Sequence, residues 1–174
     1  MTKRIPVEVI FFVGLILMFF LDGSVSLVFS NELYAFPNAM VPYLTVLWLM
    51  LSMIFIDRSS LRIGLWAAVI GFIFDMYYTG LLGVFVFIFP LVIYLGRLIF
   101  ETLPPNFFSS FLVYFIMITL VEGISCLANV VVGLVNISMT DFLVNILAPT
   151  LALNLVLFAI LYFPIERLYQ AFNR

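Results

Sequence analysis

The chain has 174 residues, of which 66% are hydrophobic and only 9% are charged, whereas soluble domains carry roughly 25% charged residues. A water-soluble fold cannot bury that much apolar surface, but a lipid bilayer can solvate it. The net charge of -2 comes with no basic patch, so we expect no nucleic-acid partner. We predict an all-α integral membrane protein with one transmembrane domain over residues 1–174.

Apolar runs bounded by charges, proline or glycine predict six transmembrane helices, because each crossing takes about 20 mostly apolar residues. The predicted spans are residues 5–21, 41–56, 63–78, 82–100, 107–132 and 142–162. The first run follows two basic residues and has the outline of a signal peptide. It is longer than a usual signal core, so we expect it to be retained.

The longest connection is residues 22–40, where aromatic and polar side chains alternate. This mixture suits either a segment at the membrane interface or a re-entrant turn that caps the bundle. Residues 57–60 predict a tight hairpin, and residues 75–80 predict a very short connection at the opposite end. Pro104 and Pro105 break the chain before the fifth span.

Charge placement supports this count of spans. With six spans all seven basic residues fall on one side: Lys3, Arg4, Arg58, Arg62, Arg97, Arg167 and Arg174. The connections on the other side contain only acidic charges: Asp22, Glu32, Asp75 and Asp141. Because cytoplasmic loops carry the excess of Lys and Arg, we predict a multi-pass protein with both termini in the cytoplasm.

Residues suited to catalysis are scarce in this sequence. Histidine is absent, which removes the commonest metal ligand and the commonest general base. An aspartyl dyad would need two facing membrane acids, and only Glu122 lies deep in an apolar run. For Cys126, the single cysteine, we expect a structural role. We predict no enzymatic activity, no metal site and no cofactor.

Small residues recur at helical spacing in the third span, at Gly64, Ala67, Ala68 and Gly71. Such stripes let helix backbones approach closely in lipid. Two interpretations stay open, namely packing within the bundle and an interface for the spanning helix of a partner. Whether that partner is a second copy of the chain, in a homodimer, is also open.

Glu122 and Asn129 share one face of the fifth span. An ionised carboxylate at that depth is costly, so it suggests a function such as proton or cation coupling. The alternative is a protonated Glu122 that hydrogen-bonds to Asn145 or Asn154 of the sixth span and ties the helices together. The lack of a second deep acid or a buried cation favours this alternative.

The third and fourth spans contain the pattern Gly-x3-Asp-x6-Leu-Gly, followed by an apolar run and a basic residue, at Gly71, Asp75, Leu82, Gly83 and Arg97. Together with the length and the six spans, this pattern resembles the MreD family of the bacterial elongation machinery. The resemblance implies a non-enzymatic scaffold in the bacterial cytoplasmic (inner) membrane. Its implied partners are MreC and, through MreC, the actin-like MreB and the peptidoglycan polymerase and transpeptidase.

The resemblance also implies a fold similar to the six-helix substrate-binding subunits of energy-coupling-factor vitamin transporters. In that arrangement Asp75 is structural and accepts hydrogen bonds from backbone N–H groups of residues 77–83, while Gly80 and Gly83 let the turn close tightly. The shared fold leaves a second function open. The chain could be the small-molecule (vitamin) binding subunit of a transporter, with Glu122 and Asn129 lining a pocket.

Overall fold

The computed structural model describes residues 6–56 and 61–172, and these residues form helices and connections without a strand. The hairpin predicted at residues 57–60 lies outside the described residues. The helices are α1 (Val7–Val28), α2 (Ser30–Leu33), α3 (Leu44–Phe55), α4 (Ile63–Phe74), η1 (Asp75–Thr79), α5 (Phe85–Phe100), α6 (Phe107–Val131), α7 (Met139–Asp141), η2 (Phe142–Leu147) and α8 (Ala148–Phe172).

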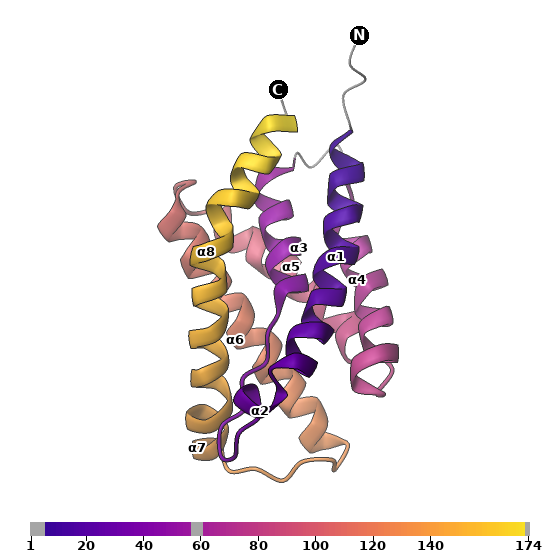
Figure 1. Cartoon of the computed structure of the whole chain (residues 1–174), viewed down its shortest axis with the longest axis vertical. Helices are drawn as coiled ribbons and strands as arrows, with labels where there is room; N and C mark the ends of the chain where they lie inside the picture. The colour runs from indigo at the N-terminus through magenta and orange to yellow at the C-terminus, as the bar shows by residue number, and fades with distance from the viewer. Residues whose placement is uncertain (1–5, 57–60, 173–174) are drawn as a thin grey trace.

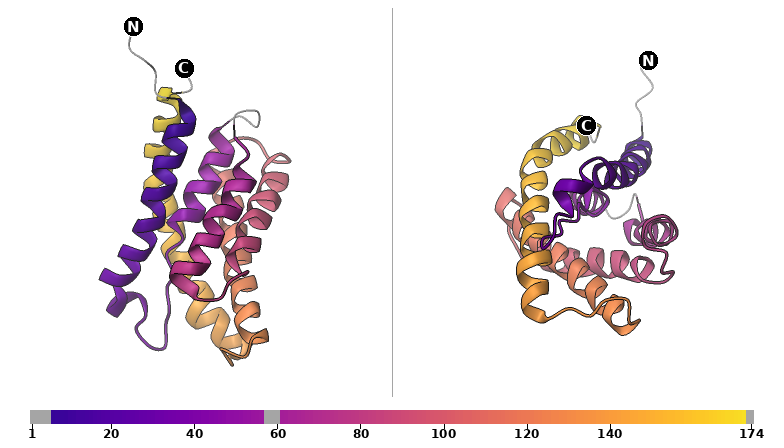
Figure 2. Two further views of the ribbon diagram at one scale, coloured as in Figure 1. Left: turned by 90° about the vertical axis from the view of Figure 1, so that its right-hand side faces the viewer. Right: turned by 60° about the horizontal axis from the view of Figure 1, so that its bottom comes forward.

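Six apolar helices run alternately down and up through the bundle, so the start of α1 and the end of α8 lie at the same end (Figure 1). Three helical stretches are long and apolar enough to cross a membrane: Val7–Val28, Phe107–Val131 and Met139–Phe172. Three shorter apolar helices accompany them: Leu44–Phe55, Ile63–Thr79 and Phe85–Phe100. In the left view of Figure 2, α1 and α8 lie on one side of the bundle and α4 and α5 on the other.

The short helix α3 is the centre of the bundle. Every side chain from Leu44 to Met53 is buried, and α3 contacts α1, α4, α5, α6 and α8. Its 12 residues make a helix about 18 Å long, which is shorter than the roughly 30 Å hydrocarbon core of a bilayer. The chain that enters α3 therefore has to cover part of that depth without helical structure.

Polar groups fix α3 to its two long neighbours. The indole nitrogen of Trp48 donates to the carbonyl oxygen of Phe11 in α1 at 3.0 Å, and Gly14 leaves the space that the Trp48 ring occupies. On the other side the hydroxyls of Ser52 and Tyr169 in α8 lie 2.7 Å apart. These bonds matter because apolar helices in lipid gain little from excluding water and depend on packing and hydrogen bonds.

Large apolar side chains cover the outside of the bundle. Phe87 is 73% exposed, Phe108 is 79% exposed and Leu27 is 79% exposed, and each lies on a different helix. Exposed apolar area of this extent is unfavourable in water but not in hydrocarbon, which solvates it. The surface therefore agrees with the membrane environment predicted from composition.

The first and last apolar helices extend beyond the predicted spans. Helix α1 continues past Asp22 to Val28, and α8 continues past residue 162 and Pro164 to Phe172. A charge and a proline usually mark the end of an apolar helix, but here the Asp22 carboxylate binds backbone groups of α3 and does not interrupt α1. The predicted connection at residues 75–80 is also mostly helical, because η1 extends α4 to Thr79.

Candidate functional site

Asp75 ends α4, and its buried carboxylate caps the first turn of α5. Oδ1 accepts a hydrogen bond from the N–H of Phe85 at 2.9 Å, while Oδ2 accepts from the N–H groups of Gly83 at 3.0 Å and Val86 at 3.3 Å. The first N–H groups of a helix have no partner inside it and carry partial positive charge, so a carboxylate there stabilises the helix start. The Asp75 side chain thus joins α4 to α5.

Three glycines of the predicted motif shape the same turn. A Cβ at Gly71 would overlap the carbonyl oxygen of Phe85, so glycine is what lets α4 and the start of α5 come this close. Gly80 ends η1 with φ 68°, and Gly83 has φ 105°. Both values lie in the region that favours glycine. The turn from α4 to α5 therefore depends on Gly71, Asp75, Gly80 and Gly83 together.

A second carboxylate, Asp22 of α1, caps α3 in the same way. It is 3% exposed, and its two oxygens accept from the N–H of Leu44 at 2.6 Å and the N–H of Thr45 at 2.9 Å. We expected Asp22 only as a charge in an outer connection. Asp22, like Asp75, is an acidic residue near the end of an apolar run, and this likeness could have indicated the cap. Each of the two short helices α3 and α5 thus begins on a carboxylate from the apolar helix that precedes it.

The chain enters α3 through residues 39–43, which are not helical and pass between α6 and α8. The Asn154 side chain of α8 binds one backbone donor and one backbone acceptor of this segment. Its Oδ1 accepts from the N–H of Tyr43 at 2.9 Å, and its Nδ2 donates to the carbonyl of Val41 at 2.7 Å. Thr150 Oγ1 accepts from the N–H of Val41 at 3.2 Å. Non-helical backbone at membrane depth is tolerated where protein groups satisfy it. Side chains of α8 do so here.

Glu122 of α6 is 7% exposed, and its Oε2 accepts a hydrogen bond from the Tyr43 hydroxyl at 2.7 Å. Within the described chain Tyr43 is its one hydrogen-bond partner. The structure therefore differs from the expected bond to Asn145 or Asn154: Glu122 binds Tyr43, and the Asn154 side chain binds residues 41 and 43. The sequence did not indicate that residues 39–43 pass between α6 and α8.

The other residues predicted from the sequence take no part in the contacts between Glu122, Asn154 and residues 39–43. Asn129 donates to the carbonyl of Ser125 in its own helix at 2.8 Å. In the small-residue stripe of α4, Ala67 and Gly71 are buried, Ala68 is half-buried, and Gly64 is exposed with open space beside it. Leu82 is 68% exposed. The stripe therefore packs inside the bundle at its Gly71 end and faces outward at Gly64.

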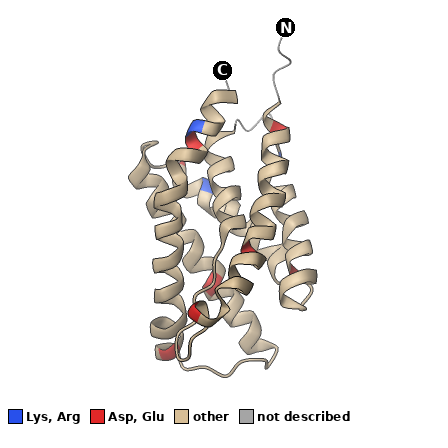
Figure 3. Cartoon of the chain, in the orientation of Figure 1, with Lys and Arg blue, Asp and Glu red and all other residues tan. Residues whose placement is uncertain are grey.

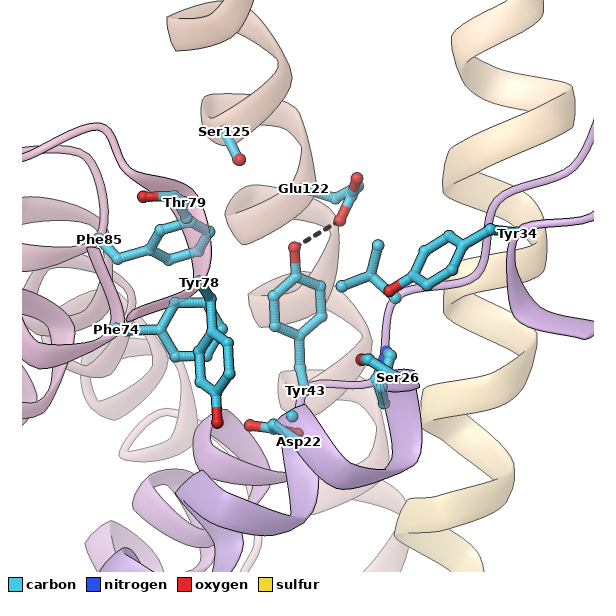
Figure 4. A pocket seen from close by; sticks show the side chains of 13 residues that line it. Asp22, Ser26, Tyr34, Tyr43, Phe74, Tyr78, Thr79, Phe85, Glu122 and Ser125 are labelled. Atoms are coloured by element: carbon cyan, nitrogen blue, oxygen red, sulfur yellow. Dashed lines mark hydrogen bonds between the residues drawn. The ribbon is translucent and has the colours of Figure 1, made fainter. Parts of the chain in front are cut away.

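A cavity of about 300 Å³ lies beside Glu122, and we call it the acidic cavity. Its walls come from α1, the segment before α3, the α4–α5 turn and α6 (Figure 4). The lining residues are Asp22, Gly23, Ser26, Tyr34, Val41, Pro42, Tyr43, Phe74, Tyr78, Thr79, Phe85, Glu122 and Ser125. Sequence reasoning named Glu122 among them but missed the aromatic residues, which come from segments far apart in the chain.

The described basic residues gather at one end of the bundle, whereas acidic residues lie at both ends (Figure 3). Arg62 precedes α4, Arg97 lies in the last turn of α5, and Arg167 lies near the end of α8, so all three are at the end where α1 begins (Figure 1). The carboxylates of the two caps and of the acidic cavity lie toward the other end. Among the described residues no group of three or more His, Cys, Asp or Glu side chains could hold a metal ion.

Six alternating apolar helices, three of them long enough to cross a bilayer, with hydrogen-bonded carboxylates inside, define a multi-pass membrane protein. The family model of the rod shape-determining protein MreD matches residues 5–172. The chain is also 29% identical over 170 residues to the rod shape-determining protein MreD of Bacillus subtilis (strain 168), covering 90% of this chain and 95% of that protein. The chain belongs to the MreD family. No solved structure matches it.

Proposed function

We propose that this chain is a non-enzymatic scaffold of bacterial cell-wall elongation. It works with MreC and, through MreC, with MreB and the peptidoglycan polymerase and transpeptidase. The observation that carries the proposal is the match to the MreD family over residues 5–172, which is nearly the whole chain. Since the family is that of rod shape-determining proteins, cell shape is the property on which the chain acts.

The proposed orientation in the bacterial cytoplasmic membrane follows from charge. Arg62, Arg97 and Arg167 lie at one end of the bundle, and the cytoplasmic side of membrane proteins carries the excess of basic residues. The chain then crosses the membrane six times with both termini in the cytoplasm. In this orientation the two carboxylate caps and the acidic cavity lie toward the outer side of the membrane.

The turn held by Asp75 and Gly71 supports a scaffolding function. Three backbone N–H groups at the start of α5 donate hydrogen bonds to the Asp75 carboxylate at the end of α4. The two helices therefore present a fixed surface at the proposed outer side. A binding surface that is ordered in advance loses less conformational entropy when a partner docks. We expect MreC to depend on this ordered turn.

Recovery of MreC with the tagged chain tests the proposal. In mild detergent, from cells of the source organism, the wild-type chain should carry MreC with it. Gly71→Ala, which pushes a methyl group into the Phe85 carbonyl, should recover less MreC per molecule of folded protein. Gly64→Ala, on the same helix but in open space, should recover as much as wild type. If folded wild-type protein recovers no MreC, the scaffold proposal is wrong.

The acidic cavity favours one alternative function, that of a small-molecule (vitamin) binding subunit of a transporter. Its volume of about 300 Å³ is at the lower end of ordinary ligand pockets. The fold similarity to energy-coupling-factor subunits stays a prediction. Thermal stabilisation of the purified chain by a vitamin, together with recovery of a pair of ATPases in place of MreC, would support the transporter function over the scaffold.

A further inference from the structure

The acidic cavity has a chemical character that the scaffold function does not explain. We propose that it binds a positively charged nitrogen group, an ammonium or a guanidinium. The volume of about 300 Å³ equals that of roughly ten water molecules. This is enough for a small organic cation or for the end of one lysine or arginine side chain.

Charge is the first reason for a cation. Glu122 and Asp22 line the cavity, and the described residues that line it include no lysine or arginine. Asp22 has both oxygens engaged by Leu44 and Thr45, whereas Glu122 uses Oε2 for Tyr43. Oε1 of Glu122 is therefore the carboxylate oxygen that can accept from a ligand. A nearly buried carboxylate is far less costly when a cation is paired with it.

Aromatic rings are the second reason. Phe74 packs against Tyr78 and Phe85 with ring centroids 4.8 Å apart in each pair, and these rings form a wall facing the Tyr43 and Glu122 side (Figure 4). The faces of aromatic rings attract cations, and desolvated cages of rings with a carboxylate suit organic ammonium groups. An anion would be repelled by the carboxylates, and a neutral molecule would gain no charge pairing from them.

The hydroxyl groups of Ser26 and Ser125 complete the lining. Ser125 lies three residues after Glu122 on α6, so its side chain is on nearly the same face. Both hydroxyls can accept hydrogen bonds from N–H groups of a ligand. An ammonium or guanidinium would thus meet a carboxylate and a hydroxyl of α6, a hydroxyl of α1 and the aromatic wall of the α4–α5 turn.

Two sources can supply such a group. One is a free organic cation, which needs no partner protein, so this source does not rest on the proposed function. The other is a lysine or arginine side chain of MreC, and this source does rest on it. The experiment therefore has one part without MreC and one part with it.

The first part measures the thermal unfolding of the purified full chain in detergent, with choline or agmatine added. A neutral molecule of the same shape as choline, 3,3-dimethyl-1-butanol, is the matched control. If the source is a free cation, choline or agmatine raises the unfolding temperature and the neutral molecule does not. In Glu122→Gln, which keeps an acceptor for Tyr43, the apparent affinity falls by more than about tenfold, since one charge of a buried pair is gone.

Asp141→Asn removes a carboxylate that is outside the cavity and engaged with Ser138, so binding should be unchanged. Ser125→Lys places an ammonium group of the chain itself in the acidic cavity. This variant tests cation binding if Glu122→Gln fails to fold. We expect Ser125→Lys to unfold at a higher temperature than wild type and to show no response to choline or agmatine.

The second part measures recovery of MreC. If the source is a side chain of MreC, Glu122→Gln and Ser125→Lys both lower recovery several-fold, and Asp141→Asn does not. The proposal is overturned if neither added cation stabilises the protein and MreC recovery is the same in Glu122→Gln as in wild type. It is also overturned if the neutral molecule stabilises as much as choline. If wild type recovers no MreC, the proposed function fails and the first part alone decides.

Discussion

Gly71 and Asp75 lie one turn apart on the same helix and act on the same turn of the next one. Gly71 leaves space for the carbonyl of Phe85, and Asp75 accepts the hydrogen bond of the Phe85 N–H at 2.9 Å. The spacing of glycine and aspartate in the motif therefore has a physical cause, because close approach of α5 is what brings its N–H groups within reach of the carboxylate.

Replacing Asp75 with asparagine should destabilise the protein. Asparagine offers one acceptor oxygen and no charge, so we expect a loss of about 1–2 kcal/mol in the free energy of unfolding, as for loss of other helix caps. Chemical unfolding in detergent micelles measures it. Asp141→Asn, at an exposed site, should stay within about 0.5 kcal/mol of wild type. Equal losses in the two variants would contradict the capping function of Asp75.

Gly71→Ala should cost more than the same change at Gly64. The added methyl group at Gly71 meets the backbone of Phe85, which cannot move aside easily, so we expect a loss of about 1–3 kcal/mol. At Gly64, in the first turn of α4, nothing lies within 4 Å of an added methyl group, so alanine should be tolerated. Unfolding measurements of the two variants under one condition test the difference, and a stable Gly71→Ala would show that the contact is unimportant.

The number of apolar helices and their order along the chain could be predicted, because each helix is a run of apolar residues in the sequence. All six predicted spans overlap an apolar helix of the structure. The ends of α1 and α8 could not be predicted from local signals. Asp22 looks like the end of a span until its partners, Leu44 and Thr45, are known. Those partners are 22 and 23 residues away, and no local pattern identifies them.

The candidate site could be predicted where its residues lie close together in the sequence, but not where they lie far apart. Asp75 and the glycines around it form one short motif, so their joint position could be inferred from the sequence. The partner of Glu122 could not, because Tyr43 is 79 residues away and reaches it through a non-helical segment. The acidic cavity exists only where four segments meet, and the side chains of any one segment do not indicate it.

Asn154→Leu should be among the most destabilising single changes in α8. It leaves the Tyr43 N–H and the Val41 carbonyl without their partner inside the protein, and each such group costs about 1–3 kcal/mol. Asn129→Leu is the matched control, since the Asn129 side chain donates to a carbonyl of its own helix. We expect Asn129→Leu to unfold close to wild type. Similar unfolding curves for both variants would show that Asn154 does not hold residues 39–43.

Labelling of single cysteines tests the proposed orientation. In a Cys126→Ser background, Asn38→Cys lies in the exposed connection before α3, and Thr102→Cys lies in the exposed connection after α5. A maleimide that cannot cross membranes should label Asn38→Cys in intact cells, and Thr102→Cys only after the cells are opened. The reverse pattern would invert the topology, and labelling of both sites in intact cells would contradict six crossings.

Depletion of this chain in its own organism tests the shape-determining function most directly. As the chain is lost, rod-shaped cells should become wide and round while growth continues for some generations. Wild-type protein and Gly64→Ala should restore the rods, and Gly71→Ala should not restore them at equal protein level. Cells that keep normal length and width after complete loss of the chain would contradict the account.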